Sequence, residues 1–66
     1  MQIQLNGEAK HLAAGLTVAQ LIDSLGLRGR RIAVERNEEI VPKSEHKITR
    51  LVDGDRIEIV HAIGGG

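Results

Sequence analysis

The chain opens with alternating apolar and polar positions, in which Met1, Ile3 and Leu5 are separated by single glutamines. A period of two residues is typical of a half-buried β-strand. An Asn-Gly pair follows at positions 6 and 7, and this pair is strongly favoured in tight hairpin turns. The pattern therefore predicts a first strand that ends near Leu5 and an antiparallel second strand over residues 8–12.

The spacing of apolar residues then changes to that of a helix. A stripe with the spacing i, i+3, i+4 and i+7 is formed by Val18, Leu21, Ile22 and Leu25. Thr17 is suited to the N-cap position, and Gln20 completes a capping box three residues later. Gly26 is placed to end the helix in a left-handed turn. We therefore predict one helix with a single apolar face.

Two short strands and a longer final strand are predicted after the helix. An alternating segment begins at Ile32, a short return follows at Ile40-Val41, and an Asp-Gly-Asp turn introduces a last strand over residues 56–62. Because the first two strands pair as a hairpin, we expect the last strand beside the first, in the centre of a mixed sheet. One helix covers only one face of a sheet. The predicted fold class is α+β, with a mixed four- to five-stranded sheet packed on one helix and its other face open to water.

The last strand leads into Gly64-Gly65-Gly66. A glycine run buries no apolar surface and costs more ordering entropy than any other sequence. We therefore predict a folded domain over residues 1–62 and a flexible tail over residues 63–66, which reaches roughly 13 Å when extended and fits a narrow channel in a partner. A docking patch for that partner is predicted just before the glycines, from Val60 and Ala62 on the open face together with Ile63. The alternative interpretations are a frayed terminus and ordinary exposed apolar residues.

The composition excludes several functions. With 66 residues the chain is one small domain, and without cysteine it has neither disulfides nor a thiolate metal site. Nine basic residues balance nine acidic ones and aromatic residues are absent, which is not the composition of a nucleic-acid-binding protein. No apolar run has the length of a membrane span, and the N-terminus does not resemble a signal peptide. We expect a cytoplasmic protein that is monomeric on its own.

Few residues suggest catalysis or metal binding. His11, His46 and His61 are scattered without ligand spacing and are interpreted as surface or rim residues. The aspartates of the turn at residues 53–55 are interpreted as turn-forming. The basic stretch at residues 28–31 is interpreted as a solvated loop after the helix, and docking to an acidic partner is favoured there over phosphate or RNA binding.

These segments together resemble the small sulfur carrier proteins of thiamine biosynthesis, the ThiS family. The resemblance covers the whole chain and is carried by the opening MQIQLNGE, the helix TVAQLIDSLGL, the stretch IAVERNEEIVPKSE and the closing LVDGDRIEIVHAIGGG. It implies a β-grasp, or ubiquitin-like, fold that ends in a Gly-Gly whose carboxylate is the working group. Alignment from the C-terminus assigns this pair to Gly65 and Gly66. If Gly66 is not the native terminus, the reactive residue is Gly65.

The resemblance also implies a mechanism and partners. A ubiquitin-activating-like adenylyltransferase would use ATP and Mg²⁺ to adenylate the Gly66 carboxylate. A persulfide sulfur donor would convert the adenylate into a thiocarboxylate, and thiazole synthase would consume that sulfur. Gly64 and Gly65 would thread the tail into these active sites. The chain is then expected to be a protein co-substrate rather than an enzyme, with no bound cofactor of its own.

Other functions share the same glycine end. The small subunit of molybdopterin synthase is a close variant, and a ubiquitin-like protein modifier would join the carboxylate to lysines of other proteins. A third alternative is a non-catalytic β-grasp interaction domain, for which the glycines would be dispensable and the open sheet face would be essential.

Overall fold

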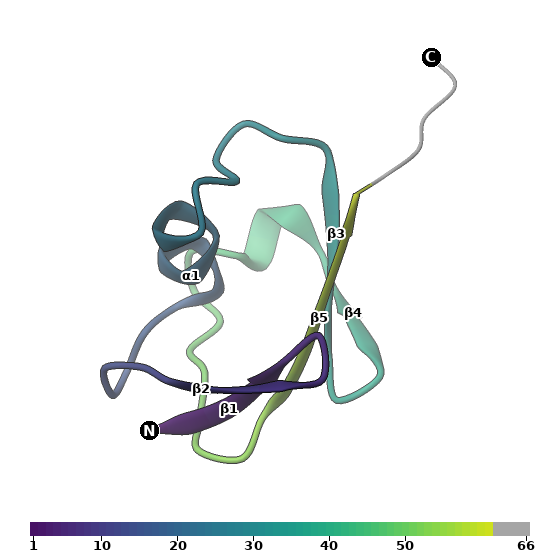
Figure 1. Ribbon diagram of the computed structural model, residues 1–66. Helices are drawn as coiled ribbons and strands as arrows, with labels where there is room; N and C mark the ends of the chain where they lie inside the picture. Colours follow the sequence, from purple (N-terminus) through teal and green to yellow (C-terminus); the bar gives the residue numbers. More distant parts are fainter. Residues whose placement is uncertain (62–66) are drawn as a thin grey trace.

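The computed structural model describes residues 1–61 as a five-stranded sheet with one α-helix on one side of it (Figure 1). In chain order the elements are β1 (Gln2–Leu5), β2 (Glu8–His11), α1 (Val18–Ser24), β3 (Ile32–Arg36), β4 (Glu39–Val41), the 3₁₀-helix η1 (Lys43–Glu45) and β5 (Arg56–His61). The strand order in the sheet is β2-β1-β5-β3-β4. The predicted fold class is confirmed, and so is the central position of the last strand. The predicted boundary between a domain at 1–62 and a tail at 63–66 lies outside the described residues and stays a prediction.

The core lies between α1 and the sheet face that the helix covers. It consists of Val18, Leu21 and Ile22 from the helix, Leu51 from the connection before β5, and Ile3, Leu5, Val34, Val41, Ile57 and Ile59 from the strands. The register places Leu5 beside Ile57 and Val34 beside Ile59. Because side chains alternate across a strand, this register sends all the buried strand residues to the same face.

The ends of α1 follow the predicted capping chemistry. The Thr17 hydroxyl oxygen accepts a hydrogen bond from the Gln20 N–H at 3.2 Å, and the Gln20 side-chain oxygen accepts one from the Thr17 N–H at 2.9 Å. At the other end Gly26 has a φ of 72°, and the Leu27 N–H donates to the Ile22 carbonyl at 3.1 Å. This is a Schellman C-cap, which ends the helix where the sequence predicted.

Two asparagines in the hairpin turns hold β5 from its two sides. Asn6, between β1 and β2, has a φ of 50°, and its side-chain oxygen accepts a hydrogen bond from the Ile59 N–H at 2.9 Å. Its side-chain nitrogen also donates to the Ile59 carbonyl at 3.4 Å. Asn37, between β3 and β4, has a φ of 51° and exchanges hydrogen bonds of 2.8 and 2.9 Å with the backbone of Arg56. Each turn residue therefore extends the pairing of its hairpin onto the last strand.

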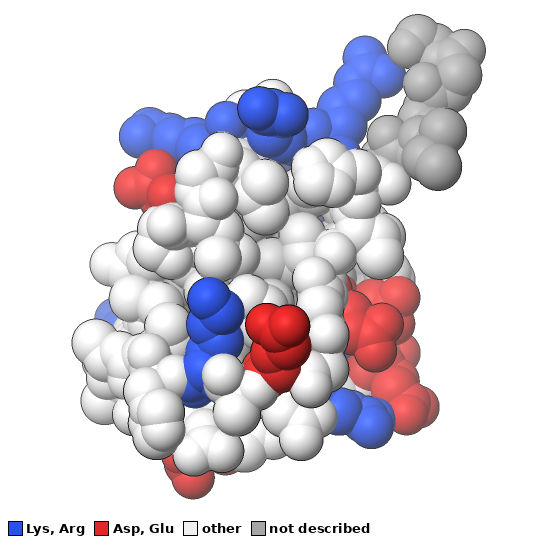
Figure 2. Space-filling view, in the orientation of Figure 1, with Lys and Arg blue, Asp and Glu red and all other residues white. Residues whose placement is uncertain are grey.

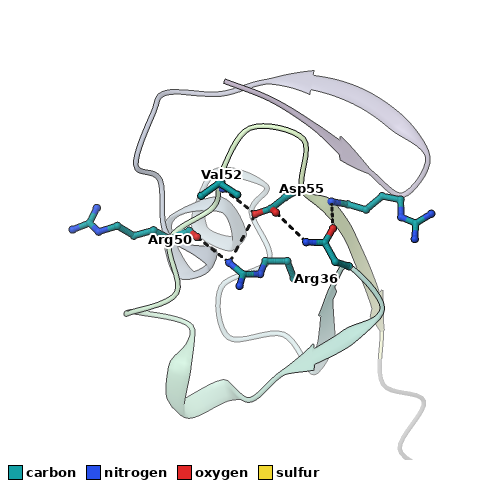
Figure 3. Close-up of polar contacts among 6 residues, drawn as sticks. Arg36, Arg50, Val52 and Asp55 are labelled. Atoms are coloured by element: carbon teal, nitrogen blue, oxygen red, sulfur yellow. Dashed lines mark hydrogen bonds and ion pairs between the residues drawn. The ribbon is translucent and has the colours of Figure 1, made fainter.

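A buried carboxylate fixes the point at which β5 begins. Asp55 is only 3% exposed, and its two oxygens accept hydrogen bonds from the Asn37 side chain at 3.0 Å and from the Val52 N–H at 2.9 Å (Figure 3). The Arg36 guanidinium lies 3.9 Å from the same carboxylate and donates to the Arg50 carbonyl at 3.1 Å. The sequence identified Asp55 as a turn residue, and the structure adds that its carboxylate ties the turn to β3 and to the loop before β5.

Replacing Asn6 with glycine tests the contribution of its side chain, because glycine keeps the positive φ and removes both bonds to Ile59. We expect the free energy of unfolding to fall by roughly 1–3 kcal/mol, since a partly buried N–H and C=O lose their partner. Urea denaturation measures the difference. The control is Glu38→Gly, at a second positive-φ position (71°) whose side chain makes only an exposed salt bridge. If the two glycine variants are equally stable, the asparagine does not hold β5.

Candidate functional site

The structure describes β5 up to His61, which pairs with Ile32 at the start of β3. This end of the sheet is also where the loop from α1 enters β3 (Figure 1). The predicted reactive residue Gly66, the threading residues Gly64 and Gly65, and two docking residues, Ala62 and Ile63, lie outside the described residues. Their predicted functions stay predictions, and Val60 is the candidate site residue whose surroundings the structure gives.

Val60 lies on the open face of the sheet, as the sequence predicted, and it is 52% exposed. It pairs with Ala33 on β3. A second exposed apolar residue, Ile40 on β4, is 62% exposed and reaches the same face because it pairs with Glu35. Val60, Ala33 and Ile40 therefore place apolar surface on β5, β3 and β4 of the open face. The sequence predicted a strand at Ile40 but not the face on which its side chain lies, because that orientation depends on the pairing register.

Two carboxylates lie directly opposite each other on the same face. Glu35 on β3 pairs with Glu58 on β5, and neither forms a salt bridge with the residues that the structure describes. Arg56 also belongs to this face, but its guanidinium binds the Glu38 carboxylate at 2.8 Å. Like charges directly across a strand pair are destabilising. The open face therefore combines apolar residues with carboxylates that an approaching cation would stabilise.

The charges of the chain are segregated despite their zero sum (Figure 2). Acidic side chains gather on the side where β3, β4 and β5 lie, whereas basic side chains follow the edge of the loop between α1 and β3. The basic residues at positions 28–31 are exposed, which confirms the interpretation of a solvated loop. The predicted preference of this loop for an acidic partner stays a prediction.

The interpretation of His46 as a surface or rim residue is wrong. His46 is buried at 9% exposure, and its Nε2 lies 3.0 Å from the Val41 carbonyl oxygen, which can only accept. The segment after η1 crosses the N-terminus of α1, where the Ala19 N–H donates to the His46 carbonyl at 2.8 Å. The first N–H groups of a helix lack partners within it, and this segment supplies two acceptors, because the Val18 N–H also donates to the Thr49 carbonyl at 2.9 Å. These contacts hold the segment against the helix, where the His46 side chain is buried. His11 and His61 are exposed, as predicted.

Neither a metal centre nor a membrane span is formed by residues 1–61. In this part of the chain no three His, Asp or Glu side chains are grouped closely enough to hold a metal ion. The same residues include no helix that is long and apolar enough to cross a bilayer.

Comparison with known proteins gives a match to the ThiS family over residues 3–66. The chain belongs to the ThiS family. It is 42% identical to the sulfur carrier protein ThiS of Bacillus subtilis over 65 residues, which cover 97% of this chain and 98% of that protein. Its fold is similar to the crystal structure of the thiamine biosynthesis protein ThiS from Geobacter metallireducens, with a TM-score of 0.87, 29% sequence identity and full coverage of both chains. The β-grasp fold predicted from the resemblance is confirmed.

A second kind of relative is a larger protein. The chain is 48% identical over 66 residues to a thiazole synthase of Paramagnetospirillum magneticum, but it spans only 20% of that protein's length. A ThiS-like segment is thus part of a longer chain in that relative. The predicted membership in the sulfur carrier family of thiamine biosynthesis is confirmed by these matches.

Replacing Glu58 with threonine should stabilise the chain, because it removes one of the two opposed carboxylates. We expect a gain of roughly 0.5 kcal/mol at low ionic strength that becomes smaller at high salt, where exposed charges are screened. Urea denaturation at two salt concentrations measures it. The matched control is Glu8→Thr on β2, where the glutamate pairs with Leu5. Equal gains in both variants would mean that threonine's strand preference, and not repulsion from Glu35, is responsible.

Proposed function

We propose that this chain is a sulfur carrier for thiazole formation in thiamine biosynthesis, with the carboxylate of Gly66 as its working group. The proposal is carried by the ThiS family match over residues 3–66, which includes the three C-terminal glycines. The central position of β5 supports it, because a strand that is paired on both edges gives the following residues a fixed point of departure. We further propose a cytoplasmic location, where ATP for the first step is available.

The first step makes the carboxylate reactive. A carboxylate is a poor electrophile. We propose that an adenylyltransferase similar to ubiquitin-activating enzymes activates it with ATP and Mg²⁺. One Gly66 carboxylate oxygen attacks the α-phosphorus of ATP, pyrophosphate leaves, and an acyl adenylate forms. The nucleotide and the metal belong to the partner in this scheme, so the carrier itself binds no cofactor.

The second step replaces oxygen by sulfur. The terminal sulfur of a persulfide on a donor protein attacks the acyl carbon, and AMP leaves with the oxygen that it activated. The resulting acyl disulfide is then cleaved by a thiol, which is oxidised to a disulfide with the donor while the acyl group leaves as a thiocarboxylate. Because the carrier has no cysteine, this sulfur has to come from a partner. A carrier thiol would also attack its own activated terminus.

The third step delivers the sulfur, and we propose thiazole synthase as the acceptor enzyme. The relative in which a similar segment forms 20% of a thiazole synthase supports this assignment. In the proposed complexes Gly64 and Gly65 pass through a narrow channel, since residues without a side chain let the backbone approach closely. Docking of the body is assigned to Val60, Ala62 and Ile63.

The deciding experiment is the intact mass of the chain after incubation with ATP, Mg²⁺, a sulfur source and the activating enzyme. We expect the mass change of one oxygen replaced by sulfur, and no change in a version that lacks Gly65 and Gly66. If neither chain changes while the enzyme modifies a known carrier, the proposal is wrong. Conjugates of the chain with lysines of other proteins would instead identify a protein modifier. Sulfur transfer only within molybdopterin synthase would identify the chain as the small subunit of that enzyme.

The substitution Gly65→Val should block adenylation and leave stability unchanged. The added side chain obstructs the channel, while residue 65 is predicted to lie beyond the folded domain. Pyrophosphate release measures adenylation, and the midpoint of thermal unfolding measures stability. A lower midpoint would contradict the predicted boundary between domain and tail, and normal pyrophosphate release would contradict the proposed threading.

The substitution Val60→Asp tests the proposed docking patch. A third carboxylate beside an apolar contact should raise KM for the activating enzyme about tenfold or more, while kcat changes little, because the tail itself is intact. The matched control is Val52→Asp, at a valine that is 57% exposed but lies outside the sheet. Equal effects of the two substitutions would remove Val60 from the docking surface.

A further inference from the structure

A groove of about 390 Å³ separates α1 from the loop before β3 and from η1. In Figure 1 the loop between α1 and β3 passes above the helix, and η1 lies beside the helix. Its apolar lining comes from Ala19, Ile22, Leu27 and Ile32. Ala19, Leu27 and Ile32 are partly exposed, so apolar surface remains accessible on the helix side of the molecule, away from the open sheet face.

The rim of this groove is strongly basic. Arg28, Arg30, Lys43 and Lys47 line it together with a single acidic residue, Asp23. Asp23 lies 3.9 Å from Arg28 in a pair that is exposed on both sides. Arg30, Lys43 and Lys47 make no salt bridge within residues 1–61. In a chain whose charges sum to zero, this concentration of cations gives the groove a positive potential that attracts acidic groups.

The interior of the groove offers little to a small polar metabolite. Ligand sites usually combine an apolar pocket with a few polar groups that fix the ligand's orientation. Here the buried His46 Nε2 is already engaged by the Val41 carbonyl at 3.0 Å, and no buried side-chain nitrogen or oxygen in the described part of the chain lacks a partner. Polar recognition is therefore confined to the rim, while the floor accepts apolar side chains.

We propose that this groove binds an acidic segment of a partner protein, which places one or two aliphatic side chains on the floor and carboxylates against the basic rim. The charge complementarity selects this occupant. The basic groove attracts acidic groups, whereas the acidic open face attracts basic ones. One partner can therefore bind at the groove while another contacts the open face. The proposal does not depend on the chemistry of the tail and goes beyond the sulfur-carrier function.

The test is an NMR titration of the ¹⁵N-labelled full chain with an acidic probe peptide, acetyl-Glu-Asp-Leu-Leu-Asp-Glu-amide. We expect saturable shifts of the Ala19, Leu27 and Lys47 amides and none at Val60. The dissociation constant should rise about tenfold between low and high salt, because the rim contacts are exposed. A peptide with serines in place of both leucines should bind at least about tenfold more weakly, since the apolar floor is then left unused.

A charge-reversed variant tests whether the basic rim residues bind the peptide. The double substitution Arg30→Glu with Lys47→Glu changes two exposed side chains and should weaken peptide binding about tenfold or more. Lys10→Glu, on β2 outside the groove, is the matched control and should change the affinity less than about twofold. The version without Gly65 and Gly66 should bind the peptide normally, which separates this result from any failure of the sulfur chemistry.

Five outcomes would overturn the proposal. Equal binding of the serine peptide, or equal loss in the Lys10→Glu control, would show non-specific attraction of charge. Shifts centred on Val60 would move the site to the open face. Tighter binding of thiamine phosphate than of the peptide at the same amides would make the groove a small-molecule site. Concentration-dependent shifts of these amides without peptide would identify a second copy of the chain as the occupant.

Discussion

β5 is paired on both of its edges and joins the two hairpins into one sheet. The strand lies parallel to β1 and antiparallel to β3. Both neighbours belong to hairpins that precede β5 in the sequence. Asn6 and Asn37 connect those hairpins to β5 with their side chains, and the buried Asp55 fixes its start. Since all these contacts are distant in sequence, the sheet closes only when the last strand enters. His61, the last described residue, therefore belongs to a strand that is held by contacts from both hairpins.

This arrangement separates the chemistry from the body that carries it. The proposed reactive carboxylate belongs to the tail, and the folded domain contributes the surfaces that we propose for partner binding. Those surfaces differ in charge, with Glu35 and Glu58 on the open sheet face and Arg30 and Lys47 at the groove beside α1. A zero net charge conceals this division. In the proposed function, two surfaces of opposite charge would allow two partners to bind the chain at different places.

The opposed glutamates, Glu35 and Glu58, carry an energetic cost on the open sheet face. Their repulsion lowers the stability of the isolated chain slightly. The strand pairing on both edges of β5 offsets this loss. Val60 and Ile40 on the same face expose apolar area that a monomer gains nothing from exposing. Functional surfaces commonly depart from the most stable choice in this way, and the open face of this chain departs from it in both charge and hydrophobicity.

The sequence by itself determined the features that depend on neighbouring residues. Alternation predicted β1, the Thr17 and Gln20 capping box predicted the start of α1, and Gly26 predicted its end, because each signal acts within a few residues. The central place of the last strand beside β1 also followed, because the first two strands pair with each other as a hairpin. The burial of His46, the orientation of Ile40, the Glu35 and Glu58 pair and the basic groove were decided only by the tertiary structure. Each depends on strand register or on packing between segments that are distant in sequence, and no local sequence pattern specifies which residues are brought together.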